Sequence, residues 1–275
     1  MRDIYTFGRK PGRRNYTVKD LQDLKKTGQR LTMVNPANAG EIRACVDAGI
    51  DILTCWDSQM ELCRELAPTH FVGTAMVWGQ FATHDEILRH AIDCMEKGAD
   101  MYYTNRSFDV VEMLARESIP VQVHMGLVPT LSHWAGGLRA FGRTADEAMK
   151  IYHEFKRYEA AGAFACEIEC VAEDTLKLLN DRTSIVTVSL GSGNAGDIIF
   201  LFMSDICGES GDNPPKHAHA FRDLGRLHRQ MYQERVEALQ EFQAEVTARR
   251  FPYARQSVTL RDGEKEKLQE ALDKL

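Results

Sequence analysis

The chain has 275 residues, a formal net charge of −6, a pI near 5.9 and 44% hydrophobic residues. The acidic balance argues against a nucleic-acid-binding protein, and the chain contains no run of about 18 apolar residues that would predict a membrane span. Length and hydrophobic content together suffice for one large α/β domain.

The ends of the chain and its cysteines carry further expectations. The first residues lack the apolar core of a signal peptide. The seven cysteines lie scattered among apolar neighbours, which predicts reduced thiols and a cytoplasmic location. The basic cluster Arg9–Arg14 is interpreted as a solvated N-terminal arm.

Short apolar runs alternate with helical patterns along most of the chain. The predicted strands, in chain order, are Leu31–Val34, Ile50–Cys55, Phe71–Val77, Met101–Thr104, Val121–His124, Phe164–Cys170 and Ile185–Leu190, with Asp205–Cys207 as a short eighth. The predicted helices are Ala39–Ala48, Met60–Leu66, Asp85–Lys97, Phe108–Glu117, Thr144–Ala161 and Asp197–Ser204. Repeated strand–helix units imply a parallel sheet, and this number of units favours a closed (β/α)8 TIM barrel.

Beyond Gly208 the pattern changes to a loop followed by charged helices, predicted over Phe221–Arg249 and Arg261–Leu275. We therefore expect a single domain over residues 1–275, with a barrel core at about 17–208 and a C-terminal helical extension at about 217–275. An apolar stripe on the first helix predicts a homo-oligomer; packing of that stripe on the chain's own barrel is the alternative. Its members are Leu224, Leu227, Met231, Val236, Leu239 and Phe242.

Two strands run out into ionisable residues, where parallel α/β proteins place their chemistry. His124 ends one predicted strand and is a candidate for proton transfer or for donation to a substrate oxygen; a core histidine bonded to a carbonyl is the alternative. Glu167 and Glu169 alternate in a later strand, and we expect them to point to opposite sides of it. Glu169 is the residue expected in the lumen, as the catalytic carboxylate.

Two loops offer further candidates. Asp57 and Ser58 follow a predicted strand, where a carboxylate can hold a divalent cation and a serine can cap the next helix. The turn Gly191–Gly196, which includes Ser192, precedes the predicted helix at Asp197 and is a candidate for binding phosphate or carboxylate. A glycine-rich loop that only turns tightly is the alternative.

Taken in order, these segments resemble the ketopantoate hydroxymethyltransferase (3-methyl-2-oxobutanoate hydroxymethyltransferase) family, of the phosphoenolpyruvate/pyruvate-type barrel superfamily. The order of the motifs is kept from about Thr17 to Val258. The matching segments are Trp56–Gln59, His124–Pro129, Gly136–Gly137, Gly142–Arg143, Ile168–Ala172, Val188–Asn194 and Pro215–Phe221.

The resemblance implies an enzyme in which a divalent cation, Mg²⁺, holds a 2-oxo acid in bidentate fashion and acidifies the neighbouring carbon. The enolate then adds to formaldehyde delivered by methylenetetrahydrofolate. Carried over by motif, Asp57 resembles a metal ligand, Ser58 and His124 resemble substrate binders, and Glu169 resembles the acid/base carboxylate.

The chain departs from the family at the cation. A second acidic ligand aligns with Ala75, and the family's Lys-x-Glu aligns with Tyr103–Asn105. We therefore expect Asp57 to bind metal weakly, or only with substrate present. Tyr103, Asn105, Arg106 and Ser192 are predicted to bind substrate, with Arg106 supplying positive charge; a simple loop arginine is the alternative.

Three functions remain open from the sequence. The first is a transferase that forms a carbon–carbon bond next to a 2-oxo acid carbonyl through an enolate. The second is a diverged, metal-weak lyase or aldolase that acts on another small 2-oxo acid or carboxylate. The third is a barrel that has lost catalysis and keeps a binding role. Retention of His124 and Glu169 favours an enzyme.

Overall fold

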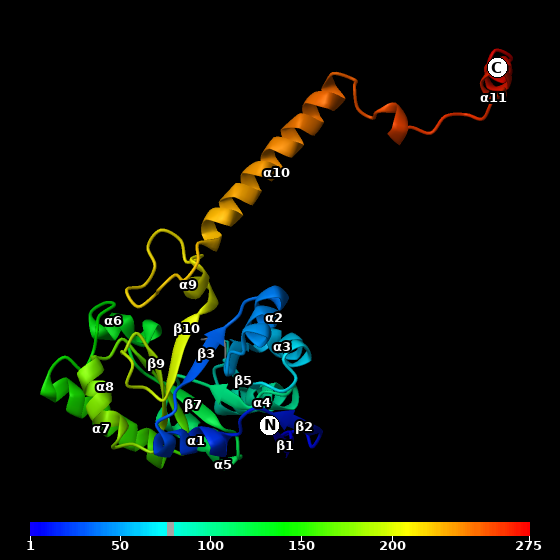
Figure 1. The fold of residues 1–275 in the computed structure, drawn as a ribbon. Helices are drawn as coiled ribbons and strands as arrows, with labels where there is room; N and C mark the ends of the chain where they lie inside the picture. The colour runs from blue at the N-terminus through cyan, green and yellow to red at the C-terminus, as the bar shows by residue number, and fades with distance from the viewer. Residues whose placement is uncertain (76–79) are drawn as a thin grey trace. The chain divides into compact units, whose positions relative to one another are not determined.

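A closed barrel of parallel strands forms the body of the protein (Figure 1). The computed structural model describes residues 1–75 and 80–275. The barrel strands are β3 Leu31–Asn35, β4 Ile52–Trp56, β5 Phe71–Ala75, β6 Met101–Tyr103, β7 Val121–Gly126, β8 Ala165–Glu169, β9 Val186–Leu190 and β10 Ile198–Phe202. They pair in the order β10-β3-β4-β5-β6-β7-β8-β9, so the predicted (β/α)8 barrel is confirmed. The end of the strand predicted over Phe71–Val77 lies outside the described residues.

Helices surround the strands, and most begin where the sequence predicts. For example, α2 is capped by Asn38 and ends at Gly49, which adopts a left-handed conformation. The helices of the barrel are α1 Val18–Thr27, α2 Ala39–Ala48, α3 Met60–Leu66, α4 His84–Glu96, α5 Phe108–Arg116, α6 Ser132–Ala135, α7 Ala145–Ala160, α8 Glu173–Asn180 and α9 Met203–Cys207.

The prediction was wrong at the eighth strand. The segment predicted as a helix from Asp197 to Ser204 is strand β10, and the predicted strand Asp205–Cys207 belongs to helix α9. A short apolar run fits a buried strand or a buried helix equally well by periodicity. The segment is a strand because it pairs with both β3 and β9 and thereby closes the barrel.

Apolar side chains pack on both sides of the strands, as expected for a parallel sheet covered by helices. In β8, Cys166 and Ile168 join the layer between strands and helices, whereas Ala165 joins the layer that fills the lumen. All seven cysteines are free, and five of them are buried, in agreement with the expected reduced thiols. Among the described residues, no helix is long and apolar enough to cross a membrane.

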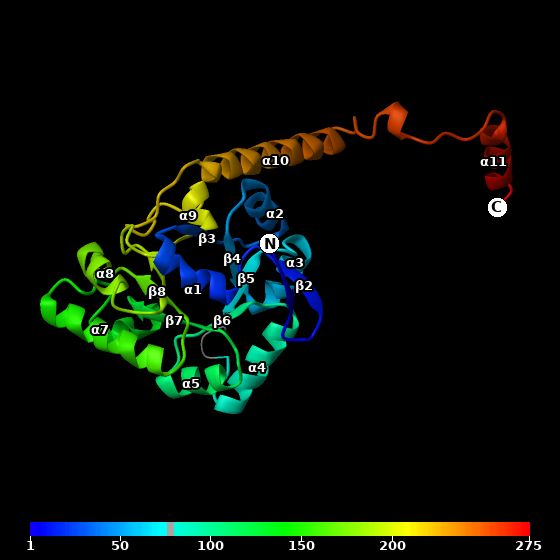
Figure 2. The same ribbon diagram turned by 60° about the horizontal axis from the view of Figure 1, so that its bottom comes forward.

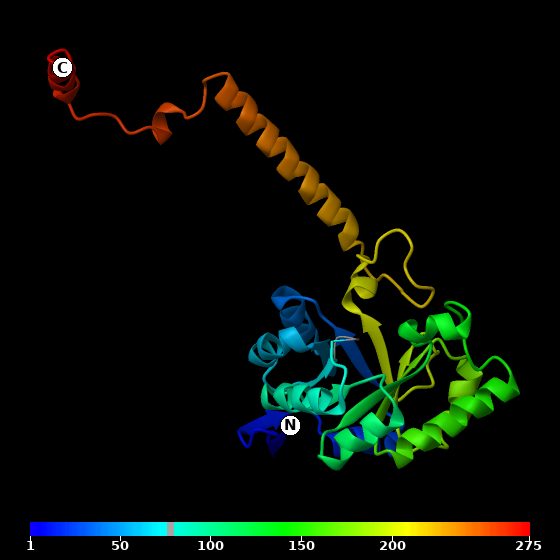
Figure 3. The ribbon, with the colours of Figure 1, turned by 180° about the vertical axis from the view of Figure 1, so that it is seen from behind.

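The chain divides into two compact units, Met1–Arg222 and Asp223–Leu275. The second unit contains α10, Leu224–Thr247, and α11, Glu264–Leu272. Helix α10 is one continuous helix (Figure 3) and has no buried residue. Within the second unit, therefore, no other segment buries the apolar stripe of α10.

The N-terminal arm is a β-hairpin, in which Arg9, Lys10 and Arg13 are exposed as predicted, whereas Arg14 is buried. Strands β1, Arg2–Tyr5, and β2, Pro11–Arg14, pair antiparallel beside α3 and α4 (Figure 2). Arg14 is only 3% exposed, and its Nε lies 2.8 Å from Asp100 Oδ1. Asp100 Oδ2 also accepts hydrogen bonds from Arg64 at 2.8 Å and from the Val72 amide at 2.9 Å. One carboxylate thus ties the hairpin, α3 and β5 together.

The Asp100→Asn variant is expected to lower the free energy of unfolding by about 3 kcal/mol, because two guanidinium groups lose their shared buried counter-charge. Urea denaturation of the full chain measures this loss. The control is Asp93→Asn, which removes a surface ion pair between Asp93 and Lys97 and should change stability by less than about 1 kcal/mol. Equal effects of the two substitutions would contradict the anchoring role.

Candidate active site at the carboxyl end of the barrel

A cavity of about 400 Å³ opens at the carboxyl ends of the barrel strands. Its lining combines ionisable side chains with aromatic rings. The lining residues are Asn35, Thr54, Cys55, Trp56, Tyr103, Thr104, Asn105, His124, Pro129, Thr130, Glu167, Glu169, Phe200 and Phe202. This is the end of the barrel at which such enzymes place their chemistry.

The register of β7 and β8 brings three ionisable side chains together. His124 lies opposite Glu167, and Gly126 lies opposite Glu169. The expectation that the two glutamates point to opposite sides was wrong, because residues two apart in a strand lie on the same face. Both carboxylates point into the lumen and line the cavity with His124.

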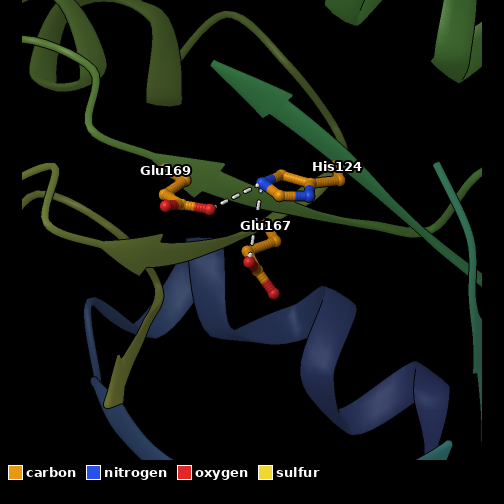
Figure 4. A group of neighbouring side chains, drawn as sticks. All are labelled: His124, Glu167 and Glu169. Carbon is orange, nitrogen blue, oxygen red and sulfur yellow. Dashed lines mark ion pairs between the residues drawn. The ribbon is translucent and has the colours of Figure 1, made fainter. Parts of the chain in front are cut away.

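Both carboxylates reach the same edge of the imidazole, as Figure 4 shows. His124 Nε2 lies 3.1 Å from Glu169 Oε2 and 3.6 Å from Glu167 Oε1. Neither contact is a well-directed hydrogen bond, so Nε2 is buried with no hydrogen-bond partner among the described residues. On the other side of the ring, the Tyr103 hydroxyl lies 2.6 Å from Nδ1 and fixes the ring orientation.

The pKa values of Glu167, His124 and Tyr103 are all raised in this cluster. Burial raises the pKa of Glu167 from 4.5 to about 7, against the opposing effect of His124. Burial by itself would lower the pKa of His124, but the charges of Glu167 and Glu169 outweigh it, and the pKa is raised above 6.5. Burial also raises the pKa of Tyr103 well above 10. Tyr103 therefore remains a neutral phenol at physiological pH.

The backbone around Glu169 is held by close packing. Gly126 has a φ of +85°, and a Cβ there would lie 2.3 Å from the Glu169 carbonyl oxygen. Cys170 adopts a left-handed φ of 52°, which costs about 1–2 kcal/mol for a non-glycine residue. Ser192 accepts a hydrogen bond from the Val171 amide at 2.9 Å and donates to the Ile168 carbonyl at 2.7 Å. These contacts fix the position of the catalytic candidate.

Ser192 therefore does not have the environment predicted for it. Its hydroxyl is buried and bonded to backbone, and it does not line the cavity. The turn Gly191–Gly196 leads into strand β10, so it does not lie at a helix N-terminus; within it, the Asn194 amide donates to Glu173 Oε1 at 3.2 Å.

Asp57 is also placed differently from the prediction. Its Oδ2 lies 3.0 Å from His90 Nε2, and His90 Nδ1 lies 2.8 Å from the Tyr102 hydroxyl. Its Oδ1 accepts a hydrogen bond from the Ser58 amide at 2.8 Å. The carboxylate is thus engaged with α4 and its own turn, and it does not line the cavity. A cation held by Asp57 does not fit this arrangement.

The remaining predicted substrate binders divide into two groups. Tyr103 and Asn105 line the cavity, and the Asn105 amide lies 3.4 Å from Thr130 Oγ1. Ser58 is exposed, and the N-cap of α3 is Gln59. Arg106 donates to the Phe81 carbonyl; neither Ser58 nor Arg106 lines the cavity.

Sequence analysis missed several residues of the cavity. Glu167 would have been found by applying the period of two to its strand. Phe200 and Phe202 were hidden because their segment was interpreted as a helix. Trp56 is 48% exposed and lines the cavity, which its place at a strand end could have suggested.

Potential metal ligands form one group among the residues that the structure describes. One atom each of His124, Glu167 and Glu169 lie within 4.8 Å of one another. No lysine or arginine is among the residues that line the cavity in the described chain. Within the described lining, His124 is therefore the one side chain that can balance the charge of the two carboxylates.

Residues 60–254 match the family described as ketopantoate hydroxymethyltransferase. The chain belongs to this family. It is 29% identical to the 3-methyl-2-oxobutanoate hydroxymethyltransferase of Deinococcus radiodurans, over 96% of this chain and 99% of the relative. It is also 29% identical to the enzyme of the same name from Hyperthermus butylicus, over 95% and 97% of the two chains.

Solved structures with the same fold are more distant in sequence. A 2,3-dimethylmalate lyase of the PEP mutase/isocitrate lyase superfamily aligns with a TM-score of 0.54 at 12% identity, over 82% of this chain and 88% of that chain. An oxaloacetate acetylhydrolase aligns with a TM-score of 0.53 at 9% identity, over 80% and 85%. These likenesses show the barrel fold. The family membership rests on sequence, and the chain is accordingly a member of an enzyme family.

Replacement of Glu167 by glutamine is expected to flatten the dependence of stability on pH. The folded wild type binds a proton that the unfolded chain releases near pH 4.5, so its stability should fall as the pH rises from 4.5 to about 7. The raised pKa of His124 also makes stability fall as the pH rises. The fall should reach at most about 3 kcal/mol.

Urea denaturation at several pH values, in metal-free buffer, measures this slope for wild type and Glu167→Gln. Glu112→Gln is the control, since Glu112 pairs with Arg116 at the surface. The prediction is wrong if the Glu167 variant keeps the wild-type slope.

Proposed function

We propose that this enzyme forms a carbon–carbon bond at the carbon next to the carbonyl of a small 2-oxo acid, by transfer of a hydroxymethyl group. The observation that carries the proposal is the His124–Glu169 contact of 3.1 Å at the barrel mouth. Family membership supports the reaction, because the relatives are named 3-methyl-2-oxobutanoate hydroxymethyltransferase.

The cavity suits a small substrate with an apolar branch. Trp56, Phe200 and Phe202 line the same cavity as the ionisable cluster, and such apolar lining favours the alkyl part of a 2-oxo acid. His124 and Asn105 supply polar groups that can hydrogen-bond to substrate oxygens. A divalent cation, when bound, would polarise the 2-oxo carbonyl and stabilise the enolate oxygen.

Glu169 is proposed as the group that moves the proton. Its carboxylate takes a proton from the carbon next to the carbonyl, and the electrons of that C–H bond form the enolate. The enolate carbon attacks formaldehyde, which is released with tetrahydrofolate when water hydrolyses methylenetetrahydrofolate. The new alkoxide then takes the proton back from Glu169, so the residue ends the cycle as a carboxylate.

The Glu169→Gln variant is expected to lower kcat by about 10²–10⁴, the usual effect of removing a general base. The assay uses 3-methyl-2-oxobutanoate and methylenetetrahydrofolate. Exchange of the substrate's C3 proton for deuterium, followed by NMR without folate, isolates the deprotonation step and should slow in parallel. Glu61→Gln, on the exposed surface of α3, is the control. Wild-type exchange in the Glu169 variant would refute the assignment.

We also propose that the enzyme is a homo-oligomer joined through its C-terminal helices. Apolar side chains on α10 are not buried by the rest of the second unit, and Leu239 and Phe242 are 67% and 53% exposed. Such a face on a soluble chain favours burial against another copy.

The seven free thiols support a reducing, cytoplasmic compartment.

Light scattering at micromolar concentration should give a mass that is a multiple of 31.1 kDa. The double variant Leu239→Glu/Phe242→Glu should reduce the mass towards one chain, because charges would face each other in the buried stripe. Glu237→Lys changes the charge of the same helix outside the stripe and is the control. A wild-type mass near 31.1 kDa would contradict the proposal.

A further inference from the structure

We infer that His124, Glu167 and Glu169 bind a divalent first-row transition-metal ion. The site would lie at the ends of β7 and β8, whereas the family resemblance places the cation on the loop after β4. The inference deepens the proposed function and rests on it for the role of the ion. Binding of the ion can be measured without turnover.

The geometry of the three side chains suits one ion. Typical bonds from Zn²⁺ to imidazole nitrogen and carboxylate oxygen are about 2.0–2.2 Å long, so adjacent ligand atoms lie about 3–3.5 Å apart. His124 Nε2 lies 3.1 Å from Glu169 Oε2 and 3.6 Å from Glu167 Oε1. The third separation is within the 4.8 Å that bounds the whole group. Small side-chain movements would complete the coordination.

The histidine is oriented as a ligand. His124 is 5% exposed, and its Nε2 is buried without a hydrogen bond while facing both carboxylates. Its other nitrogen is held by the Tyr103 hydroxyl at 2.6 Å. Metal-bound histidines commonly have such a second partner, which fixes the ring and its tautomer. A phenol oxygen can accept a hydrogen bond from Nδ1–H as well as donate one, so Tyr103 fits a ring that binds metal through Nε2.

The charges of the cavity favour a cation. Glu167 and Glu169 are both largely buried, with side chains 9% and 12% exposed. Among the described residues that line the same cavity, His124 is the one basic side chain, and no lysine or arginine joins it. A protonated His124 can balance only one of the two carboxylates, and burial of the second charge is costly. A divalent ion would balance them and would give a 2-oxo acid, itself an anion, a positive centre to bind.

The ligand set selects the kind of ion. Imidazole nitrogen favours Zn²⁺, Co²⁺, Fe²⁺ and similar ions, whereas Mg²⁺ prefers oxygen ligands alone. Asp57, the residue expected to hold Mg²⁺, is engaged with His90 at 3.0 Å. Coordination by Glu169 through one oxygen leaves the other oxygen able to take the substrate proton, so binding and proton transfer are compatible.

The test is a titration of the full-length, metal-free protein with Co²⁺, followed by its visible absorption and by calorimetry. One Co²⁺ per chain is expected. Glu167→Gln and His124→Asn should each weaken binding by at least about tenfold, since the loss of a second-sphere partner alone costs about 10–100-fold. Asp57→Asn, the matched control, should leave Co²⁺ affinity and spectrum unchanged.

Circular dichroism and urea denaturation test whether each variant is folded. If Glu167→Gln does not fold, Glu167→Asp takes its place, and the Asp variant should shift the visible spectrum of bound Co²⁺. The inference is overturned if wild type binds no Co²⁺, or if Asp57→Asn abolishes binding while the Glu167 variant retains it. Co²⁺ binding without turnover of 2-oxo acids would refute the proposed function alone. If the protein binds no Co²⁺ and still turns over the 2-oxo acid in the presence of a chelator, this inference alone would be refuted.

Discussion

The pairing of β7 with β8 is the constraint on which the candidate site depends. This register sets His124 opposite Glu167 and Gly126 opposite Glu169. A shift of one residue would turn the ionisable side chains of one strand into the helix layer. The apolar alternation of β8 opposes such a shift, because Cys166 and Ile168 pack outward between the strands and the helices. Packing of β8 against the surrounding helices therefore fixes which ionisable side chains reach the carboxyl end of the barrel.

Concentrating two carboxylates and a histidine in one buried place has an energetic cost, which the surrounding structure offsets. Tyr103 satisfies one ring nitrogen, and the strained Cys170 is held by its amide hydrogen bond to the Leu190 carbonyl at 2.9 Å. Ser192 bonds to backbone on both sides of Glu169. Such support of a strained, charged segment is typical of functional sites. A merely structural loop would not require it.

The chain departs from the pattern of its family at the positions that resemble the family's cation site. The positions that resemble its cation site hold Ala75 and Asn105, and Asp57 is turned to His90. Acidic side chains are instead gathered on β8, where Glu167 stands beside Glu169. The ionisable groups that line the mouth therefore come from β7 and β8, the strands on which the proposed cation binding and proton transfer both depend.

Local sequence was sufficient for much of this protein. Apolar runs and caps predicted the barrel and seven of its strands, and strand ends located His124 and Glu169, because these features depend on neighbours in the chain. The eighth strand, Ile198–Phe202, was decided by its pairing with β3 and β9. The partner of Asp57, His90, comes from a helix far along the chain, and the neighbours of Glu167 come from other strands. Such contacts depend on how the strands close into a barrel, and no local pattern encodes them.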